Sequence, residues 1–585
     1  MDKKKDFYFD LKFLKALFNL TPYFFPKNNW YSECIIIFIF ILGLTSEWIG
    51  YKIGMIPGQM YSALLNDNTK IFWEIIITGS LMYLFKSFII ALIDFTSQCL
   101  YLIFRKNITN ALHNVYFNDI TGYKLMYTCH NDIDNPDIRI TQDVDKMSKD
   151  LAITIIPTTL ICPFVIGYYT YITYITAGGF GCGMIYGYFI IGTIINKLLI
   201  SPIAKWTNRV EICEGNFRYK EVTIRDNIEE ISFYKGQKFE KFETNKFLDK
   251  LLITQFLLCI WRFPNIFWKN FFNYFGALLS YGVQYIPIFL FNSYKDIDPK
   301  KLPEIISNNA FIYIYLANSF TRLTDIALIS GEMAGLLQRV YELLDTCINI
   351  NGIRYNNINL IDENDSIMYK FDNVNISSYE GNVIIKEISL IIENKKNLLI
   401  RGPSGSGKTS IIRVLSGLWK ISSGEILGKY SIDDIEIIPQ KPYLPVGNLS
   451  LYQLITFPSL NNEESFEINQ KVDIIFGLLE KLQLLQLIEK SSSIFDELPN
   501  DFLNTLTPGE IQRLVFIRSI IKNPKIIILD ESTNSVDSDI ECIMYNIMKE
   551  QNIQYISIGH RDSLIRHHDQ CLTLKGHNNY TIEFF

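Results

Sequence analysis

Charged side chains are scarce in this chain of 585 residues, and neither sign of charge dominates. Charged residues make up 20% of the sequence, whereas a typical soluble domain contains about 25%. The 55 Lys and Arg residues are offset by 61 Asp and Glu residues, which gives a formal net charge of −6. This balance argues against a protein that binds nucleic acid through an excess of positive charge.

Cysteine clusters are also missing. The ten cysteines form no C-x-x-C pair and no tight group with histidine, which argues against a disulfide framework and against an evident zinc site. We expect most of them to be small buried side chains. Apolar residues are abundant, at 48% of the chain, and this excess predicts that part of the chain lies in lipid.

The apolar residues concentrate before residue 350, and six runs there approach or exceed the roughly 18 residues of a membrane span. The runs lie near Cys34–Tyr51, Ile75–Phe104, Leu151–Tyr174, Gly181–Ile200, Ile266–Phe291 and Phe311–Ser330. Beyond residue 350, shorter apolar segments alternate with Gly-rich turns and helical patterns, as in a soluble α/β domain. We therefore expect a membrane α-helical domain with six transmembrane helices over residues 1–350 and a soluble α/β domain over residues 351–585.

Two of the connections between the predicted spans are long, polar and helical in pattern. With six spans, these two loops lie on the same side of the membrane as both chain ends, and basic residues place that side in the cytosol. The basic residues are Lys3, Lys4, Lys5, Arg105, Lys106, Lys205, Arg209 and Arg218. The polar start of the chain does not resemble a cleavable signal. The amphipathic stretch Leu11–Phe25 predicts a helix on the membrane surface.

Residues 402–409 read Gly-Pro-Ser-Gly-Ser-Gly-Lys-Thr, which fits the phosphate-loop pattern G-x-x-x-x-G-K-[ST]. An apolar strand, Leu398–Ile400, precedes this loop, and a helical pattern over Ser410–Leu418 follows it. Backbone N–H groups of such a loop converge on phosphate oxygens, Lys408 would reach the β- and γ-phosphates, and the Thr409 hydroxyl would ligate Mg²⁺. The predicted contacts with the nucleotide are Gly402, Ser404, Gly405, Ser406, Gly407, Lys408, Thr409 and Ser410.

A second run, Lys525–Glu531, has the pattern of a buried strand that ends in two carboxylates. A carboxylate at a strand end lies where a magnesium-bound phosphate needs one, so Asp530 would hold the metal and Glu531 would polarise the attacking water. Taken alone, each feature has a structural explanation: a Gly-rich turn for the loop and a solvated strand end for the carboxylates. Together they predict a site for ATP and Mg²⁺.

Further residues resemble the motifs of the ATP-binding cassette (ABC) family. The stretch Leu506–Arg513, Leu-Thr-Pro-Gly-Glu-Ile-Gln-Arg, is similar to the family signature, and Glu531–Asp537 is similar to the loop after the second carboxylate. Gln440 and His560 complete the family order of motifs. The resemblance implies that the soluble half is an α/β P-loop ATP-binding cassette domain. It also implies that the signature of one subunit closes on ATP held by the phosphate loop of another.

The resemblance assigns roles to these residues. Thr507 and Gly509 would contact the γ-phosphate in trans, Gln440 would sense metal and water, and His560 would contact the γ-phosphate. Asp537 lies in the loop after the second carboxylate and is expected to bind nucleotide. The implied catalytic residues are Glu531, His560 and Gln440, and the implied metal ligands are Thr409, Gln440 and Asp530.

Two positions leave questions open. Tyr379 resembles the aromatic residue that stacks on adenine, although a tyrosine at a strand end is often only a packing residue. The signature departs from the commoner L-S-G-G-Q form, because Thr507 keeps a hydroxyl whereas Pro508 has no backbone N–H. We expect ATP binding to persist, and the rate of hydrolysis stays open.

One cassette and six spans are typical of a half-transporter, which would form a closed two-fold dimer with two composite ATP sites. The chain resembles the peroxisomal-type half-transporters of subfamily D at residues 135–144, 214–218, 229–236, 417–419 and 559–564. The resemblance covers nearly the whole chain. It implies an organellar membrane protein, a homodimer or a heterodimer, that moves a small molecule by means of ATP hydrolysis.

Within subfamily D, two features favour export of cobalamin (vitamin B12) from the lysosome. The polar segment before the first span has only about 30 residues, short for a peroxisomal targeting region, and residues 506–513 are most similar to the signature of the cobalamin-exporting branch. Peroxisomal import of long-chain fatty acids or acyl-CoA is the alternative, and a location in the endoplasmic reticulum also stays open. From other classes, an ATP-gated channel or a non-transporting escort subunit remains, although Glu531 favours hydrolysis.

Charged residues inside the predicted spans are costly in lipid unless they face a cavity or a partner. Arg322 and Asp325, three residues apart in the sixth span, lie on one helical face and are predicted to be able to pair. The same residues are also candidates for the wall of the transport path, and Arg322 is our hypothesis for such a residue. Others of this kind are Lys86, Asp94 and Lys197.

Overall fold

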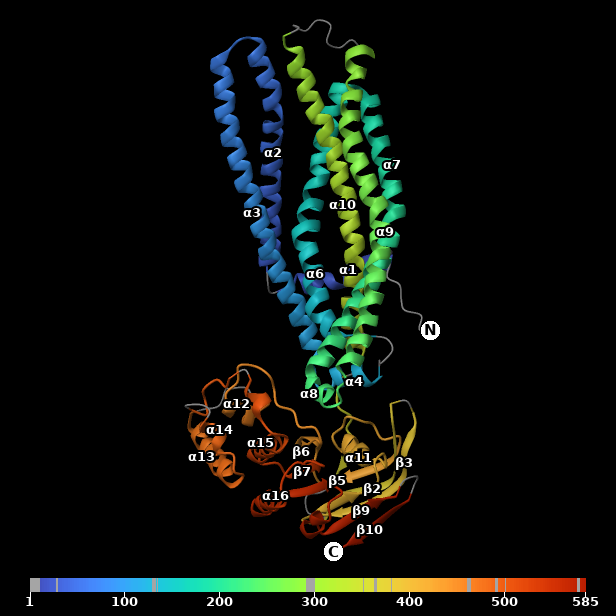
Figure 1. The fold of residues 1–585 in the computed structure, drawn as a ribbon, viewed down its shortest axis with the longest axis vertical. Coiled ribbons are helices and arrows are strands. Elements are labelled where there is room, and N and C mark those ends of the chain that lie inside the picture. The colour runs from blue at the N-terminus through green and yellow to red at the C-terminus, as the bar shows by residue number, and fades with distance from the viewer. Residues whose placement is uncertain are drawn as a thin grey trace. The chain divides into compact units, whose positions relative to one another are not determined.

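A computed structural model describes residues 11–27, 30–128, 133, 135–290, 300–350, 352–361, 366–379, 381–459, 465–489, 493–499, 501–575 and 579–585. The chain divides into two compact units. The first comprises Met1–Leu125 and Cys129–Asn351, and the second comprises Met126–Thr128 and Gly352–Phe585. The first unit is helical, and the described strands all lie in the second (Figure 1).

Long helices dominate the first unit, because its apolar runs are long and turn residues are few. The helices are α1 (Leu11–Phe24), α2 (Tyr31–Leu65), α3 (Thr69–Tyr116), α4 (Thr121–Thr128, whose last three residues belong to the second unit), α5 (Pro136–Ile138), α6 (Val144–Lys149), α7 (Ile156–Asp226), α8 (Ile228–Phe233), α9 (Gln237–Val283) and α10 (Leu302–Asn349). Short π-helical segments lie at Arg139–Asp143, Asp150–Ile155 and Ile286–Leu290. The two predicted polar loops are thus helical, as their pattern indicated.

Four described helical segments are long and apolar enough to cross a membrane: Tyr31–Leu65, Thr69–Tyr116, Pro136–Leu199 and Gln237–Phe289. The prediction of six spans is therefore not confirmed by length and composition. The predicted sixth span lies in α10, where polar residues such as Asn318, Arg322 and Asp325 interrupt the apolar sequence.

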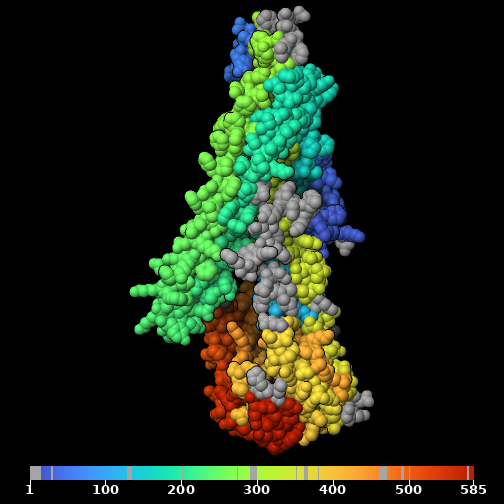
Figure 2. Space-filling model, turned by 90° about the vertical axis from the view of Figure 1, so that its right-hand side faces the viewer, coloured from blue at the N-terminus to red at the C-terminus, as the bar shows by residue number. Residues whose placement is uncertain are grey.

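Helix α7 contains the fourth predicted span and all of the third except its first five residues, which lie in the π-helical segment Asp150–Ile155. Its backbone leaves the helical conformation at Gly178, where φ is 69° and ψ is −176°. The hydroxyls of Thr170 and Tyr186 lie 2.9 Å apart, whereas sixteen residues of straight helix would separate them by about 24 Å. The chain therefore reverses at Gly178, and α7 consists of two antiparallel segments. Its second segment runs beside α9, and both are visible on the face shown in Figure 2.

Helix α1 is amphipathic, as predicted, and its apolar face packs inside the helical unit. Leu20 and Phe24 are buried, and the ring centroid of Phe24 lies 5.0 Å from that of Phe104 in α3. Asn19 also donates a hydrogen bond to the hydroxyl of Tyr341 in α10, at 2.8 Å. Contacts with α3 and α10 thus hold this helix in the unit.

The predicted pairing of Arg322 with Asp325 is wrong in the described residues. Arg322 pairs instead with Glu47 of α2 at 3.0 Å, and Asp325 pairs with Lys269 of α9 at 2.9 Å. Two different helices present the opposite charges to α10, so Arg322 and Asp325 each have a partner from another helix.

The second unit contains two sheets. A four-stranded sheet has the order β1-β5-β2-β3, and a six-stranded sheet has the order β10-β9-β4-β8-β7-β6. The strands are β1 (Ile358–Leu360), β2 (Ile367–Ser377), β3 (Val383–Glu393), β4 (Leu398–Arg401), β5 (Ser423–Gly428), β6 (Ile435–Ile438), β7 (Ile526–Asp530), β8 (Gln554–Ile558), β9 (Gln570–Leu574) and β10 (Tyr580–Phe584). The helices are α11 (Lys408–Leu415), α12 (Leu451–Thr456), α13 (Ser465–Lys481), α14 (Gln486–Glu489), α15 (Pro508–Ile521) and α16 (Ser538–Glu550).

Five strands of the larger sheet are parallel, and only β10 runs antiparallel to its neighbour. Strands β7 and β8 are buried along their whole length, as expected for the centre of a parallel sheet covered on both faces. Because parallel strands end at the same edge, the loops that follow them are brought together there.

Buried hydrogen bonds that include Ser557 of β8 determine which ring nitrogen of His568 carries the proton. Its Nδ1 lies 2.7 Å from the carbonyl oxygen of Leu564, so Nδ1 carries the proton, and its Nε2 accepts from the hydroxyl of Ser557 at 2.8 Å. The hydroxyl of Ser557 lies 2.9 Å from that of Tyr545. Burial lowers the pKa of His568 to about 4, so the folded protein holds this imidazole neutral.

We expect acid to destabilise the protein through His568. In the unfolded chain this group binds a proton near pH 6.5, and in the folded protein only near pH 4. Stability therefore falls as the pH decreases across this window, by up to about 3 kcal/mol for this residue. The His568→Asn variant keeps a donor near the position of Nδ1 but does not titrate. Thermal unfolding of the full chain in detergent at pH 7.5, 6 and 5 should show a smaller acid loss in the variant. If acid lowers the unfolding temperature of the wild-type chain and of the variant equally, His568 does not cause the acid destabilisation.

Candidate active site

Loops after four parallel strands carry the predicted site residues. The phosphate loop follows β4, Gln440 follows β6, Glu531 follows β7 and His560 follows β8. These four strands are neighbours in the order β4-β8-β7-β6. The topology therefore collects residues that are up to 158 positions apart in sequence, such as Gly402 and His560, at one edge of one sheet.

The phosphate loop forms a compact turn between β4 and α11. The Nζ atom of Lys408 donates to the carbonyl oxygens of Gly402 and Pro403, at 2.7 and 3.0 Å. The hydroxyl of Ser406 is buried and has no hydrogen-bond partner among the described residues. A lysine folded over its own loop and an unsatisfied buried hydroxyl are features that a bound phosphate group would complete.

Asp530 and Thr409 lie in direct contact. The hydroxyl of Thr409 donates a hydrogen bond to the carboxylate of Asp530. Burial raises the pKa of Asp530, and the hydrogen bond from Thr409 offsets part of that increase. In the described part of the chain, no group of three or more His, Cys, Asp or Glu side chains forms a metal site. A cation here would thus need oxygen atoms beyond these two residues.

Glu531 is the centre of the site. Its Oε2 accepts hydrogen bonds from the side-chain amides of Gln440 at 3.0 Å and Asn534 at 3.1 Å. Its Oε1 lies 3.5 Å from Nε2 of His560. The three predicted catalytic residues therefore meet in one cluster. Glu531 has a φ of 49°, an uncommon value for a residue other than glycine and typical of strained functional positions.

The signature residues begin helix α15. Thr507 caps the helix by accepting from the backbone N–H of Glu510 at 3.3 Å, and the carboxylate of Glu510 accepts from the backbone N–H of Thr507 at 2.8 Å. Burial would raise the pKa of the Glu510 carboxyl, but the hydrogen bonds that it accepts from the backbone N–H and hydroxyl of Thr507 and from Gln486 outweigh burial and lower the pKa. Pro508 occupies the first helical position, where a backbone N–H has no partner within the helix, so proline fits there.

The signature packs on the loop that follows Glu531. A Cβ atom on Gly509 would lie 2.7 Å from the carbonyl oxygen of Ser535, so only glycine permits this approach. The side chain of Gln512 accepts from the backbone N–H of Ser535 at 3.2 Å. Gly509 is thus placed against residues 531–537, and Thr507 lies two residues before it as the N-cap of α15.

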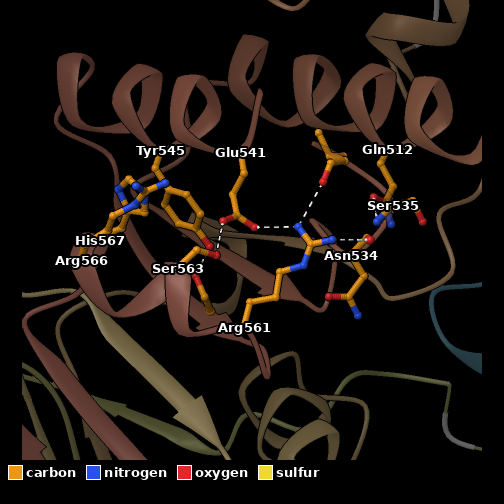
Figure 3. Close-up of polar contacts among 11 residues, drawn as sticks. Gln512, Asn534, Ser535, Glu541, Tyr545, Arg561, Ser563, Arg566 and His567 are labelled. Atoms are coloured by element: carbon orange, nitrogen blue, oxygen red, sulfur yellow. Dashed lines mark hydrogen bonds and ion pairs between the residues drawn. The ribbon is translucent and has the colours of Figure 1, made fainter. Parts of the chain in front are cut away.

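Arg561 holds the same loop from the other side (Figure 3). Its guanidinium donates to the carbonyl oxygens of Asn534 at 2.8 Å and Val536 at 3.0 Å. It also lies 3.4 Å from the carboxylate of Glu541, which is fully buried and accepts from the hydroxyl of Ser563 at 2.7 Å. Arg561 therefore links the segment that carries His560 to the loop that begins at Glu531.

Three residues of this arrangement escaped the assignment of roles from the sequence: Asn534, Arg561 and Glu541. Asn534 lies within the motif Glu531–Asp537, and Arg561 directly follows His560. Both are thus adjacent to residues that have an assigned role. Glu541 has no such signal, because an acidic residue in a helical pattern usually faces solvent.

Two other predicted nucleotide contacts lie at the margin of the cluster. The hydroxyl of Tyr379 donates to the carbonyl oxygen of Leu418 at 2.6 Å, and its ring meets that of Trp419 edge to face at 5.8 Å. These contacts leave its stacking on adenine a prediction. Asp537 precedes helix α16 as its N-cap residue. Its contact with nucleotide also remains a prediction.

Comparisons with known proteins agree with this geometry. The family model for ABC transporter transmembrane region 2 matches residues 20–289, and the ABC transporter model matches residues 385–534. The human lysosomal cobalamin transporter ABCD4 is 32% identical over 97% of this chain and 95% of its own length. The chain belongs to subfamily D of the ABC transporters. The mouse ABCD4 is 31% identical over 98% of this chain and 96% of its own length.

A more distant member of subfamily D also matches most of this chain. The D family member 3 of Dictyostelium discoideum is 26% identical over 94% of this chain and 86% of its own length. The chain is therefore an ABC half-transporter, a membrane protein with one cassette, and half-transporters of this family generally form dimers. It binds ATP and couples ATP hydrolysis to the transport of a small molecule.

Proposed function

We propose that this half-transporter exports cobalamin from the lysosome to the cytosol as a homodimer. The observation that carries the proposal is its similarity to the human and mouse lysosomal cobalamin transporters over nearly the whole length of each chain. The similarity is not confined to the cassette, which binds ATP in every member of the family. It extends through the helical unit, where a transported molecule must pass.

The proposal includes six spans in residues 1–350, followed by the cassette in residues 351–585. Helices α2 and α3, the two segments of α7, and helices α9 and α10 would each cross the membrane once. The reversal at Gly178 supports two spans in α7. The charges of α10 are paired with α2 and α9, which lowers the cost of placing this polar helix within the membrane.

The nucleotide site would hold ATP together with Mg²⁺. Thr409 and Asp530 supply oxygen atoms of the kind that Mg²⁺ prefers. Gln440 donates through its Nε2 to Glu531, which leaves its carbonyl oxygen for the cation. Bound there, Mg²⁺ would neutralise charge on the phosphates.

The residues of the chain then have distinct tasks. Lys408 would exchange its two carbonyl partners for phosphate oxygens, and Glu531 would accept the proton of the attacking water. His560 would hold the γ-phosphate from the other side of Glu531. Thr507 and Gly509 would complete the ATP site of the partner subunit, as the family resemblance implies, while within the chain Gly509 packs on the loop after Glu531. ATP would thereby favour the closed dimer and shift the helices to one facing.

The identity of the substrate can be tested by measuring phosphate release from ATP by the full chain in liposomes. We expect cyanocobalamin to stimulate ATP hydrolysis several-fold, and palmitoyl-CoA to have no effect, because transport substrates act by favouring one conformation of the coupled helices. The Glu531→Gln variant is the blank for contaminating ATPases. Stimulation by palmitoyl-CoA alone would overturn the proposal in favour of acyl-CoA import.

A further inference from the structure

A pocket lies inside the helical unit between α7, α9 and α10, and it contains none of the nucleotide-site residues. Aromatic rings form one part of its wall. Phe189 of α7 stacks on Phe320 of α10 with centroids 4.2 Å apart, and Tyr188 of α7 meets Phe272 of α9 at 5.0 Å. These contacts join all three helices. One wall of the pocket is therefore made of packed aromatic rings.

Amides line another part of the pocket. Asn265 of α9 is 7% exposed, and its Nδ2 donates to the side-chain oxygen of Asn196 at 3.0 Å. Asn196 in turn donates to the backbone oxygen of Thr324 at 3.2 Å. The side-chain oxygen of Asn265 accepts no hydrogen bond from the described residues, yet it is not sealed from the pocket. This acceptor therefore has room for a donor that the chain itself does not supply.

An ion pair between α9 and α10 forms the rest of the polar wall of the pocket. Lys269 and Asp325 lie 2.9 Å apart, with their side chains 43% and 39% exposed. A half-exposed pair in a membrane region faces water, a ligand or a partner rather than lipid. Because the two charges cancel, the pocket has no net charge to attract an anion such as a phosphate. Its ammonium and carboxylate groups still offer hydrogen-bond donors and acceptors.

The free volume limits what can enter. The pocket leaves about 50 Å³, and one water needs about 10–15 Å³ on this measure. The space thus suits a group of three or four heavy atoms. A primary amide has three, and it both donates and accepts hydrogen bonds, as the lining requires. An alkyl chain would leave the oxygen of Asn265 without a partner, which is unfavourable in a buried site.

We propose that this pocket binds a primary-amide arm of the transported molecule. The proposal rests on the proposed function, because cobalamin carries several such arms around its corrin ring. The N–H groups of the amide would donate to the side-chain oxygen of Asn265 and to the hydroxyl of Thr321, and its oxygen would accept from Lys269. The aromatic wall would pack against the apolar part of the arm. The rest of the corrin lies outside the pocket.

Binding of radiolabelled cyanocobalamin to the full chain in lipid nanodiscs tests the pocket. Asn265→Leu keeps the shape of the side chain but removes the acceptor, and we expect it to weaken binding by roughly 10- to 100-fold. Thr321→Val is the second variant, in case Asn265→Leu does not fold. It should weaken binding less, because its hydroxyl already donates to the carbonyl oxygen of Ala317 at 3.3 Å. The thermal unfolding midpoint in nanodiscs checks that each variant is folded.

Thr193→Val is the matched control. Thr193 lies on α7 next to the pocket but outside its lining, and its hydroxyl donates to the carbonyl oxygen of Phe189 four residues earlier, at 2.9 Å. The same substitution is thus made in the same local geometry, and we expect normal binding.

A second probe tests the amide directly. Cyanocobalamin derivatives with one amide arm hydrolysed to a carboxylate should bind the wild-type chain more weakly for at least one arm, and Asn265→Leu should lose this preference. If the wild-type chain binds cyanocobalamin and neither Asn265→Leu nor Thr321→Val weakens binding, the proposed amide site is wrong. The proposed function would then still stand. If the wild-type chain does not bind cyanocobalamin, both proposals fail.

Discussion

Replacement of Glu531 by Gln should reduce ATP turnover at least about 100-fold, the usual contribution of a general base, and leave ATP binding intact. The amide is nearly the same size as the carboxylate and still accepts a hydrogen bond from Gln440 or Asn534, which lie 3.0 and 3.1 Å from Oε2 of Glu531. It cannot take a proton from water, however. Phosphate release at saturating ATP measures the loss, and a fluorescent ATP analogue measures binding.

The same variant should accumulate the ATP-bound dimer, because the nucleotide that closes the cassettes is no longer consumed. Light scattering in detergent with ATP should then give twice the chain mass of 68.0 kDa. Glu550→Gln is the matched control, since Glu550 is an exposed residue that pairs with Lys481, and surface pairs contribute little. Full ATPase activity in Glu531→Gln would show that another group acts as the base.

The Arg339→Met variant should lose about 3–5 kcal/mol of stability, the usual cost of breaking a buried ion pair from one side. Nε of Arg339 lies 3.3 Å from Oδ2 of Asp143, and the two side chains are only 4% and 1% exposed. The two atoms form an ion pair but are not aligned for a hydrogen bond. Nearby, Arg139 pairs with Glu342 at 3.1 Å. Methionine would leave the carboxylate of Asp143 buried without the guanidinium of Arg339.

A double variant separates charge from packing. Asp143→Leu together with Arg339→Met replaces the whole pair by apolar side chains, and we expect it to regain most of the lost stability. Arg225→Met is the control, because Arg225 and Asp226 form an exposed pair on the last turn of α7. Thermal unfolding midpoints in detergent compare the variants. A double variant no more stable than Arg339→Met would show that the single variant fails by packing.

The local parts of the nucleotide site were predictable from the sequence because each one is contiguous. The phosphate loop, the strand that ends at Asp530 and the signature each carry their residues within a few positions, so a pattern of residue types indicates their geometry. Their order along the chain also predicted the cassette. The parallel sheet then brings Gln440, Glu531 and His560 to one edge.

Contacts between distant segments were not predictable in the same way. Arg322 and Asp325 are three residues apart, and local geometry favours their pairing. Their partners in the structure, Glu47 and Lys269, are 275 and 56 positions away, and nothing in a single sequence indicates which helices will be neighbours. The position of Arg561 between Glu541 and the loop after Glu531 has the same origin. These contacts depend on packing and not on local pattern.

Hydropathy did not confirm the count of six spans, and this too has a physical reason. Helix α10 carries charges that its neighbours neutralise, so its hydropathy alone does not identify it as a span. Helix α7 shows the opposite problem, because a single residue, Gly178, separates its two segments. Hydropathy treats each segment separately and does not describe how sharply the chain turns between them.

In the lysosomal membrane that we propose for this half-transporter, the sharp turn at Gly178 affects resistance to proteases. Helices α2 and α3 are joined by Asn66, Asp67 and Asn68, and the two segments of α7 are joined at Gly178. By the proposed topology, both connections face the lumen. Proteases cleave exposed, extended loops far more readily than hydrogen-bonded helices. At these two connections, lysosomal hydrolases would meet very little chain that they can cut.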